Sequence, residues 1–284
     1  MTRTTDSERR AKGEKLRALH ERSEPFVIPN PWDVGTARLL AMLGFEALAT
    51  TSAGCAFALG VPDNRIDRVQ AIEHVRVLAA ATPLPLSADL ENGFGDDPET
   101  VAETIRLAAQ AGAVGGSIED IDTRSERPQY AFEHAVERVR AAAEAAHALD
   151  FPFTLTARTE NYLVGNPDLR DTIRRLQAFQ DAGADVLYAP GLTRREDIAE
   201  IVRSVDRPVN VLMGSPALRL GVDDLAALGV RRISVGSALS RAALGAFLRA
   251  AREIREHGSF GFGADAVNYA EINEMFARFG REPS

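Results

Sequence analysis

Short apolar runs alternate with longer amphipathic stretches along this chain, and glycine marks many of the boundaries. Gly44, Gly112, Gly183 and Gly229 each follow a helical pattern and precede an apolar run that is too short for a helix. Glycine is favoured just past a helix because it adopts a positive φ angle readily. The pattern predicts eight strands, at 26–29, 46–51, 84–89, 113–118, 153–157, 185–189, 208–212 and 231–235. It predicts helices between and after them, at 33–43, 67–81, 98–111, 130–148, 168–182, 194–204, 222–228 and 238–256.

Strict alternation of strands and helices predicts an α/β fold with a parallel sheet covered by helices. Eight repeats favour a closed (β/α)8 TIM barrel over an open doubly wound sheet. No Gly-x-Gly-x-x-Gly segment opens the first helix, which weakens a dinucleotide-binding alternative. We therefore expect an N-terminal helical extension at 1–24, a catalytic barrel at 25–257 and a C-terminal helical extension at 258–284. The last extension carries a surplus helical pattern, which we expect to pack on a neighbouring subunit.

The charge balance narrows the possible partners more than it narrows the fold. The 284 residues include 33 Lys and Arg against 41 Asp and Glu, which gives a formal net charge of −8. An acidic chain disfavours nucleic acid and anionic membranes as partners, because both need a basic face. No apolar stretch approaches the ~20 residues of a membrane span, and the N-terminus lacks the apolar core of a signal peptide. Cys55 is the single cysteine, so no internal disulfide can form, and we expect a cytoplasmic protein.

Acidic side chains and one arginine gather at the predicted carboxyl ends of successive strands. Asp89 and Glu91 alternate at the end of one strand and would line the same face. The following strands end in Glu119 and then in Arg158 with Glu160. Barrel enzymes place their chemistry at this end. Four carboxylates there are costly to bury without partners, and a set of oxygen ligands suits Mg²⁺. Further polar candidates at strand ends are Asn30, Thr51, Ser52, Asn210 and Ser237.

Simpler interpretations exist for each of these residues. Asp89 and Glu91 could cap the turn and helix that follow them, and Glu119 could also be a cap. Arg158 could pair with a neighbouring acid, or it could clamp a substrate carboxylate through a bidentate contact. A phosphate-binding barrel is a rival class, and its candidate segments are Gly214-Ser215 and Gly236-Ser237. The acids speak against it, because phosphate sites need amides and cations; a non-catalytic metabolite binder of the same fold is a further rival.

Five segments resemble signatures of the isocitrate lyase/phosphoenolpyruvate mutase superfamily, and they are spread over nearly the full chain. They are Asn30-Pro-Trp-Asp33, Thr50-Thr-Ser-Ala-Gly54, Asp89-Leu-Glu-Asn-Gly-Phe-Gly95, Glu119-Asp120 and Ala157-Arg158. The third is similar to the pattern Asp-x-Asp-x-Gly-[Tyr/Phe]-Gly, with Glu91 in place of the second Asp. The correct spacing of the Asp-rich signature, the Glu-Asp pair and the Ala-Arg pair makes the resemblance specific.

The resemblance implies a metal site and an oligomer. Mg²⁺, or Mn²⁺ in its place, would lie near Asp89, with Glu91 and Glu119 acting partly through water. The last helix of the barrel would be swapped between subunits, usually in a homotetramer built as a dimer of dimers. This arrangement would use the surplus helical pattern at 264–280.

The resemblance also implies a binding site for a small carboxylic acid. Arg158 and the segment Ser52, Ala53 and Gly54 would hold an α-keto carboxylate, and we add Asn210 as a substrate-binding candidate. The segment Gly60-Val-Pro-Asp-Asn64 is similar to a gating loop of the family, which makes Asp63 a catalytic candidate beside Arg158 and Glu119. The simpler interpretation of Asp63 is an ordinary Pro-Asp turn.

One departure from the family pattern bears on the reaction. Cleaving lyases carry a Lys-[Lys/Arg]-Cys-Gly-His motif after the fourth-strand Glu, whereas the segment 120–134 contains no Cys. The Lys-rich loop of the mutase is missing too, and Cys55 lies elsewhere. We expect a Mg²⁺-dependent lyase that cleaves a C–C bond in a small keto or hydroxy acid through a pyruvate-type enolate. It would resemble oxaloacetate decarboxylase or methylisocitrate lyase. The alternatives are a phosphonomutase or phosphonopyruvate hydrolase acting on a P–C bond, and a non-catalytic keto-acid binding barrel.

Overall fold

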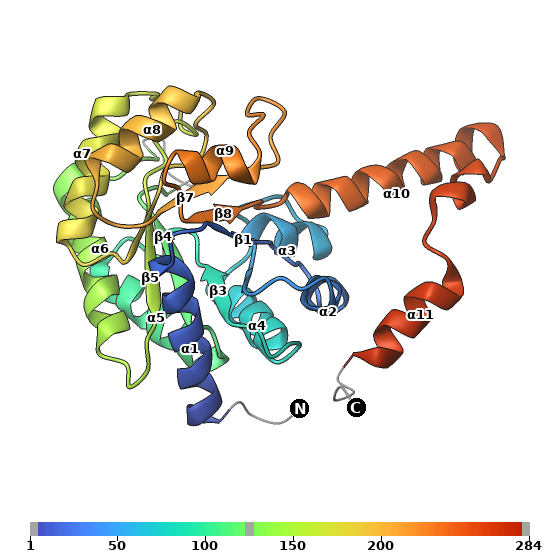
Figure 1. The fold of residues 1–284 in the computed structure, drawn as a ribbon, viewed down its shortest axis with the longest axis horizontal. Coiled ribbons are helices and arrows are strands. Elements are labelled where there is room, and N and C mark those ends of the chain that lie inside the picture. The colour runs from blue at the N-terminus through green and yellow to red at the C-terminus, as the bar shows by residue number, and fades with distance from the viewer. Residues whose placement is uncertain (1–4, 123–127, 280–284) are drawn as a thin grey trace.

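The predicted strands form one parallel sheet that curves into a barrel (Figure 1). This computed structural model describes residues 5–122 and 128–279. Within them the sheet has eight strands in the order β1-β8-β7-β6-β5-β4-β3-β2. The strands are β1 (Phe26–Ile28), β2 (Leu48–Ala49), β3 (Leu86–Asp89), β4 (Gly115–Glu119), β5 (Thr154–Arg158), β6 (Val186–Tyr188), β7 (Val209–Leu212) and β8 (Arg232–Ser234). The (β/α)8 prediction is confirmed.

Between β1 and β2 the barrel is closed by individual hydrogen bonds rather than by a strand ladder. β1 pairs with β8, with Phe26 opposite Arg232, but β1 and β2 share no ladder. The Ala49 N–H instead donates to the Pro29 carbonyl at 3.1 Å, just past the end of β1. The Asn30 side-chain amide donates to the Thr50 carbonyl at 2.8 Å. Asn30 is therefore a structural clamp across the seam of the barrel.

The helices follow the predicted pattern with one addition. They are α1 (Asp6–Glu21), α2 (Val34–Met42), α3 (Ser52–Ala58), α4 (Arg68–Ala79), α5 (Pro98–Ala111), α6 (Phe132–His147), α7 (Leu169–Asp181), α8 (Arg195–Ser204), α9 (Val222–Ala227), α10 (Ala238–His257), the 3-10 helix η1 (Gly261–Asp265) and α11 (Tyr269–Arg278). Predicted strands and barrel helices end within two residues of the observed ones. The exception is α3, where we expected a loop; Thr51 caps it by accepting from the Gly54 N–H at 3.2 Å.

Helix α1 packs against the amino-terminal end of the barrel rather than standing free. Leu16, Leu19 and His20 are buried on its inner face. A Cβ added to Gly115, the first residue of β4, would lie 2.9 Å from a Leu16 methyl group. Burying a leucine side chain stabilises a fold by about 1.5–3 kcal/mol, so this helix contributes to the core while it closes one end of the barrel.

Helix α10 leaves the barrel and extends into solvent, and α11 returns toward α2 (Figure 1). Phe247 on α10 is 65% exposed, and Tyr269 on α11 is 84% exposed. Near the end of α11, the Arg38 guanidinium of α2 lies 5.1 Å from the centre of the Phe279 ring. Among the described helices, none is long and apolar enough to cross a membrane.

Two glycines of the helix–glycine–strand pattern allow a test of the packing that surrounds it. Gly44 and Gly112 both have positive φ, at 86° and 108°. A Cβ at Gly44 would meet nothing within 4 Å, whereas one at Gly112 would lie 2.9 Å from the Ala79 Cβ. We expect Gly44→Ala to cost about 1–2 kcal/mol and Gly112→Ala about 2–4 kcal/mol, because only the second adds crowding to backbone strain. Urea unfolding measures both, and equal costs would contradict this account of the packing.

Candidate active site

Arg158 lies at the centre of the acidic side chains that end β3, β4 and β5. Its Nη1 is 2.7 Å from Glu119 Oε1 and 3.3 Å from Asp89 Oδ1. Its Nε is 2.8 Å from Glu160 Oε1. The side chain is only 13% exposed, so these are buried rather than surface ion pairs. The register explains the meeting, because Glu119 lies directly opposite Arg158 across the β4–β5 ladder.

The guanidinium of Arg158 also stacks on an aromatic ring that the sequence analysis missed. Its Cζ lies 4.8 Å from the centre of the Tyr188 ring, and Tyr188 pairs with Arg158 in the β5–β6 register. Such a cation–π contact holds the guanidinium plane in place. Burial raises the pKa of Tyr188 to about 12, so the phenol stays protonated. Tyr188 ends a short apolar strand, and its sequence context resembled ordinary core.

The charges around Arg158 shift one another's pKa in ways that suit proton transfer. Burial raises the pKa of Glu119 well above its usual range, although Arg158 opposes the shift. Burial raises the pKa of Glu160 in the same way. Burial disfavours the charged form of Arg158, but Glu119 and Glu160 outweigh it and raise the pKa of the guanidinium. Carboxyl groups with raised pKa values are candidates for acid and base roles.

Asp89 joins the arginine cluster to the start of α3. Its Oδ2 accepts from the backbone N–H of Ser52 at 2.9 Å and from the Ser52 hydroxyl at 2.8 Å. Its Oδ1 faces Arg158, and the Ser117 hydroxyl lies 3.5 Å away. Ser52 was expected to hold substrate, and in this structure its donors instead orient Asp89. Its role toward a substrate stays a prediction, as do those of Ala53 and Gly54, which follow it in α3.

The segment that was compared with a gating loop covers the outer edge of this cluster. Burial and the negative charge of Asp89 raise the pKa of Asp63, and the charge of Arg158 opposes this. The carboxyl of Asp63 therefore interacts electrostatically with Asp89 and Arg158, although the residue as a whole is exposed. Asn64, the next residue, has a φ of 61°, a conformation that Asn tolerates better than most residues. Asn64 lines a small cavity together with Glu91 and Glu119, so Asp63 lies beside the site, and a catalytic role for it stays a prediction.

Glu91 belongs to a second small space beside the cluster. It lines a cavity of about 20 Å³ together with Asn64, Asn92, Phe94 and Glu119. Its backbone has a φ of 48°, so the chain turns sharply after Asp89. The same turn carries Phe94 at a φ of 61°. Three residues in the left-handed region near one site, Asn64 included, indicate strain of the kind that functional sites retain.

The donor set is compatible with Mg²⁺ but does not form a closed metal cage. Within residues 5–122 and 128–279, no three His, Cys, Asp or Glu side chains converge as ligands of one ion. Mg²⁺ normally keeps several waters and needs only one or two carboxylates. Asp89 and Glu119 could hold it in that way, with Glu91 acting through water, so the residues fit the ion. The assignment of Asp89, Glu91 and Glu119 to the metal, with Glu91 and Glu119 acting partly through water, stays a prediction.

Asp120 takes no part in the cluster and instead anchors the chain after β5. Its Oδ1 accepts from the Glu160 N–H at 2.9 Å, and its Oδ2 accepts from the Thr159 hydroxyl at 2.9 Å. Arg175 Nη1 lies 3.1 Å from Oδ2, and the Gln129 amide donates to the same oxygen at 3.2 Å. Asp120 therefore fixes Glu160, which in turn holds Arg158.

Below the cluster, the barrel interior is polar around a cavity of about 40 Å³. TIM barrels usually fill this space with bulky branched side chains. Here the lining residues are Asn30, Ala49, Thr50, Ser87, Ala88, Asp89, Ser117, Thr156, Arg158, Tyr188, Asn210, Arg232, Ser234 and Gly236. The predicted binder Asn210 is among them, and its side-chain amide donates to the Ser234 hydroxyl at 2.9 Å. Arg232 was not predicted, although an arginine in the short final strand was a visible signal.

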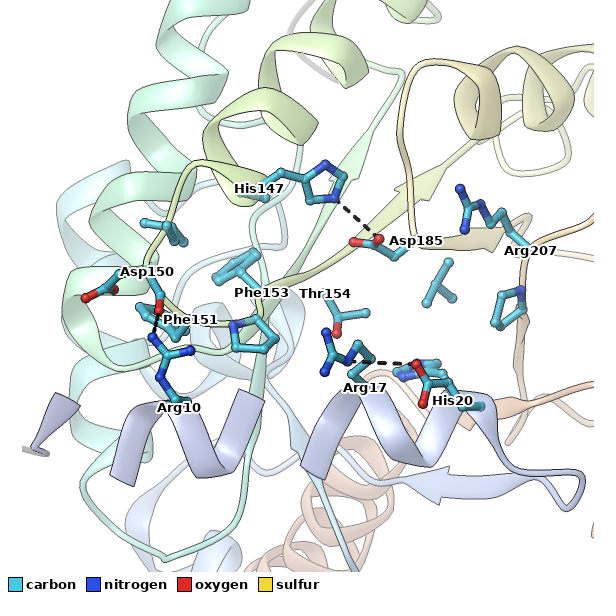
Figure 2. Close-up of a pocket in the computed structure, with 16 residues that line it drawn as sticks. Arg10, Arg17, His20, His147, Asp150, Phe151, Phe153, Thr154, Asp185 and Arg207 are labelled. Atoms are coloured by element: carbon cyan, nitrogen blue, oxygen red, sulfur yellow. Dashed lines mark hydrogen bonds and ion pairs between the residues drawn. The ribbon is translucent and has the colours of Figure 1, made fainter. Parts of the chain in front are cut away.

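A much larger cavity lies at the opposite end of the barrel, under α1 (Figure 2). It measures about 510 Å³ and is lined by α1, the starts of β5 and β6, and the segment before β7. Two contacts join side chains that line it, one of 3.4 Å between His147 and Asp185 and one of 3.8 Å between Arg17 and Glu21. It faces away from the carboxyl ends of the strands, so we do not assign the chemistry to it.

The single cysteine, Cys55, is not suited to the acid–base role that a Cys has in the cleaving lyases. Cys55 is a free, buried thiol, and burial raises its pKa to about 11, so it is a poor nucleophile or acid. Cys55 packs in a small buried cluster with Ala56, Ile66 and Ala71. The segment 120–134, where the Cys motif would lie, contains no Cys, and its residues 123–127 lie outside the described residues.

A parallel barrel with an arginine and several acids at the carboxyl ends of its strands defines a TIM-barrel enzyme site. Residues 16–255 match the family model of phosphoenolpyruvate phosphomutase, and the chain belongs to that family. This confirms the superfamily resemblance seen in the sequence.

Three similar proteins illustrate the family. A solved structure from Burkholderia cenocepacia, provisionally named a lyase/mutase, has 62% sequence identity and a TM-score of 0.93 and covers 96% of this chain and 98% of its own. Oxaloacetate decarboxylase of Paraburkholderia xenovorans is 30% identical over 79% of this chain and 75% of its own. The structure of a phosphonopyruvate hydrolase in complex with oxalate and Mg²⁺ has 26% identity and a TM-score of 0.82 and covers 94% and 95%. Relatives with named activities support a carbon–carbon lyase.

Removing Asp120 tests whether the anchor supports the site. We expect Asp120→Ala to destabilise the fold by about 3–5 kcal/mol, because it removes one of the two carboxylates that pair with the buried Arg175 and leaves the Glu160 N–H without its acceptor. Glu200→Ala is the matched control: its pair with Arg203, at 2.6 Å, is about half exposed and should be worth about 1 kcal/mol or less. Chemical denaturation at neutral pH gives both values. Similar losses in the two variants would show that the Asp120 network is not a structural anchor.

Proposed function

We propose that this chain is a Mg²⁺-dependent lyase that cleaves a C–C bond of a small α-keto acid, with oxaloacetate as the model substrate. The observation that supports this most is the Arg158 cluster. A buried guanidinium held by three carboxylates and an aromatic ring at the carboxyl ends of the strands presents a fixed cation next to acids that can take part in proton transfer. The named decarboxylase relative supports the same reaction class.

In this proposal each side chain has a role in the reaction that follows from its position in the site. Arg158 binds the carboxylate next to the keto group, and Tyr188 keeps the guanidinium in one plane. When bound near Asp89, Mg²⁺ would polarise the keto group as a Lewis acid. Loss of CO₂ leaves an enolate, and a protonated carboxyl must then deliver a proton to carbon. Asp63 has a raised pKa, so we assign this proton transfer to Asp63, while Glu119 helps to hold the metal.

The shape of the site favours a short substrate. The cavity below Arg158 is about 40 Å³, which leaves room for little more than one carboxylate group. The buried Cys55 thiol cannot replace the missing acid of the methylisocitrate-cleaving enzymes. Decarboxylation needs no acid at the leaving group, because CO₂ leaves without protonation. Phosphonopyruvate is a competing substrate of similar size, which the experiment below separates.

Pyruvate release from a substrate panel tests the proposed function. We expect the wild-type protein with Mg²⁺ to release pyruvate from oxaloacetate faster than Mg²⁺ alone does, and chelation to abolish the difference. Arg158→Gln and Asp89→Asn should each lower kcat/KM about a hundredfold or more, since truncating one partner of a buried charge pair costs about 2–5 kcal/mol.

Arg22→Gln is the matched control, because Arg22 pairs with Glu46 at 2.7 Å on the surface and lies outside the site. Its kcat/KM should stay near the wild-type value. Turnover of phosphonopyruvate in place of oxaloacetate would overturn C–C cleavage. No turnover of any panel member would favour a binding protein without catalysis.

The exposed arm of α10 and α11 supports assembly into a homo-oligomer. Leu244, Phe247 and Leu248 on α10 are 40%, 65% and 46% exposed, so the residues that the structure describes leave this apolar face partly uncovered. A second copy of this chain is the occupant that we propose. Swapping would exchange the α11–α2 contact between copies at little cost, because the contact itself is unchanged. A dimer of dimers is the assembly that we expect.

Light scattering after size exclusion tests the assembly. We expect the wild-type protein to run as a tetramer and Phe247→Glu to shift it to smaller species, because a charge on the proposed interface opposes burial. Val69→Glu is the control, since Val69 is 77% exposed on α4, which is not part of the proposed interface. A wild-type monomer, or a tetramer that Phe247→Glu leaves intact, would contradict the role of the arm.

A further inference from the structure

Arg232 is a buried cation that contacts only neutral groups. The residue is 5% exposed and extends from β8 across the barrel interior. Its Nη1 donates to the Thr156 hydroxyl at 3.0 Å and its Nη2 to the Ser87 hydroxyl at 3.4 Å. Its Nε has no hydrogen-bond partner among the described residues. No carboxylate of the described chain forms an ion pair with it, in contrast to Arg158.

Burying a guanidinium without an anion lowers the stability of the fold, so the presence of Arg232 in the barrel interior needs a physical reason. Burial lowers the pKa of Arg232 to about 10, and the charge of Arg158 adds to the shift. A group with that pKa is still charged at neutral pH. The barrel interior therefore holds a permanent positive charge directly under the active site.

The position of Arg232 follows from strand geometry. Thr156 and Arg158 are two residues apart on β5, as are Ser87 and Asp89 on β3. Residues at that spacing share a face and lie about 7 Å apart along a strand. Since Arg232 donates to Thr156 and Ser87, its guanidinium lies one layer below the pair of Arg158 and Asp89.

The cavity of about 40 Å³ is lined by residues of both layers. Its charged lining residues are Arg158, Arg232 and Asp89, two cations against one anion. Asp89 already accepts hydrogen bonds from Ser52 and Arg158. A carboxylate group, about the size of two or three waters, fits such a space.

The cavity is closed from below, so an anion must enter from the active-site side. His20 of α1 is buried at the amino-terminal end, with its ring edge-on to Phe26 at a centroid distance of 4.9 Å. Burial lowers the pKa of His20 to about 3, and Arg232 contributes, so this residue is neutral and offers no counter-charge. Leu16 and Leu19 fill the rest of that end.

Resting on the keto-acid function above, we propose that Arg232 is a further substrate-binding residue. The carboxylate attached to the keto carbon enters the cavity and lies between Arg158 above and Arg232 below. The remainder of the substrate then points toward the mouth of the site near Asp63. The chemical class that this subsite selects is a carboxylate next to a carbonyl carbon, with bulk tolerated only on the far side.

The chemistry of cleavage supports this orientation. The bond between the third carbon and the departing carboxylate breaks, and its electron pair moves toward the keto oxygen. Cations beside the retained carboxylate and the keto group stabilise the charge that develops there. Cations around the departing carboxylate would instead stabilise the ground state and slow its conversion to neutral CO₂. The two buried guanidiniums therefore suit the retained end.

Calorimetric titration with oxalate in the presence of Mg²⁺ tests the assignment. We expect Arg232→Gln to raise the Kd at least tenfold, because it removes a buried charge-assisted contact. Arg232→Lys should recover part of the affinity, since it keeps the charge and loses the fork of donors. Arg207→Gln, an exposed arginine at the other end of the barrel, should bind as the wild-type protein does.

Arg158→Gln separates this inference from the proposed function. If Arg158→Gln weakens oxalate binding and a folded Arg232→Gln binds within twofold of wild type, the Arg232 subsite is wrong and the proposed function stands. If neither variant changes the Kd, both proposals fall.

A measurement on the wild-type protein covers the case in which the Arg232 variants do not fold. Formate is a carboxylate small enough for the cavity, and at constant ionic strength it should raise Tm saturably by a few degrees relative to chloride. Benzoate should not. Formate should also compete with oxalate, because the substrate's own carboxylate occupies the subsite. No rise in Tm would overturn the subsite, and a rise without competition would assign it to a free anion instead.

Discussion

The burial of the Arg158 guanidinium among carboxylates is the interaction on which the site depends. Asp89, Glu119 and Glu160 come from three different segments and would repel one another in a low-dielectric interior without this cation. The arginine in turn could not be buried at 13% exposure without them. The parallel register brings them together, and Tyr188 fixes the plane of the cation. The fold and the charge cluster therefore stabilise each other.

The same strands carry two polar layers, and this distinguishes the barrel from a packed apolar core. The upper layer contains Asp89 and Arg158, and the lower one contains Ser87, Thr156 and Arg232. Hydroxyl groups in the lower layer satisfy donors without adding charge, which leaves a net cationic interior below an acidic rim. A barrel built in this way has a smaller apolar core, which lowers its stability, and it gains a preorganised anion site. Functional sites commonly have such a cost in stability.

Much of this architecture could be read from the sequence, because its signals are local. Glycine after four of the helices marked the strand starts that follow them, and the spacing of Asp89, Glu119 and Arg158 placed them at strand ends that a parallel barrel brings together. Helix α3 was missed because Ser52–Ala58 is short and mostly small residues, with no periodic apolar stripe. The pairing of Ser52 with Asp89 and the reach of Arg232 to β3 and β5 depend on tertiary geometry, which no local pattern encodes.

The most direct test of the account is a crystal structure of the protein grown with oxalate and Mg²⁺. The account predicts oxalate at the carboxyl ends of the strands, with one carboxylate within hydrogen-bonding distance of Arg158 and the metal ion bound by Asp89. Oxalate bound elsewhere, for example in the cavity under α1, or bound away from Arg158 with Asp89 free of metal, would contradict it.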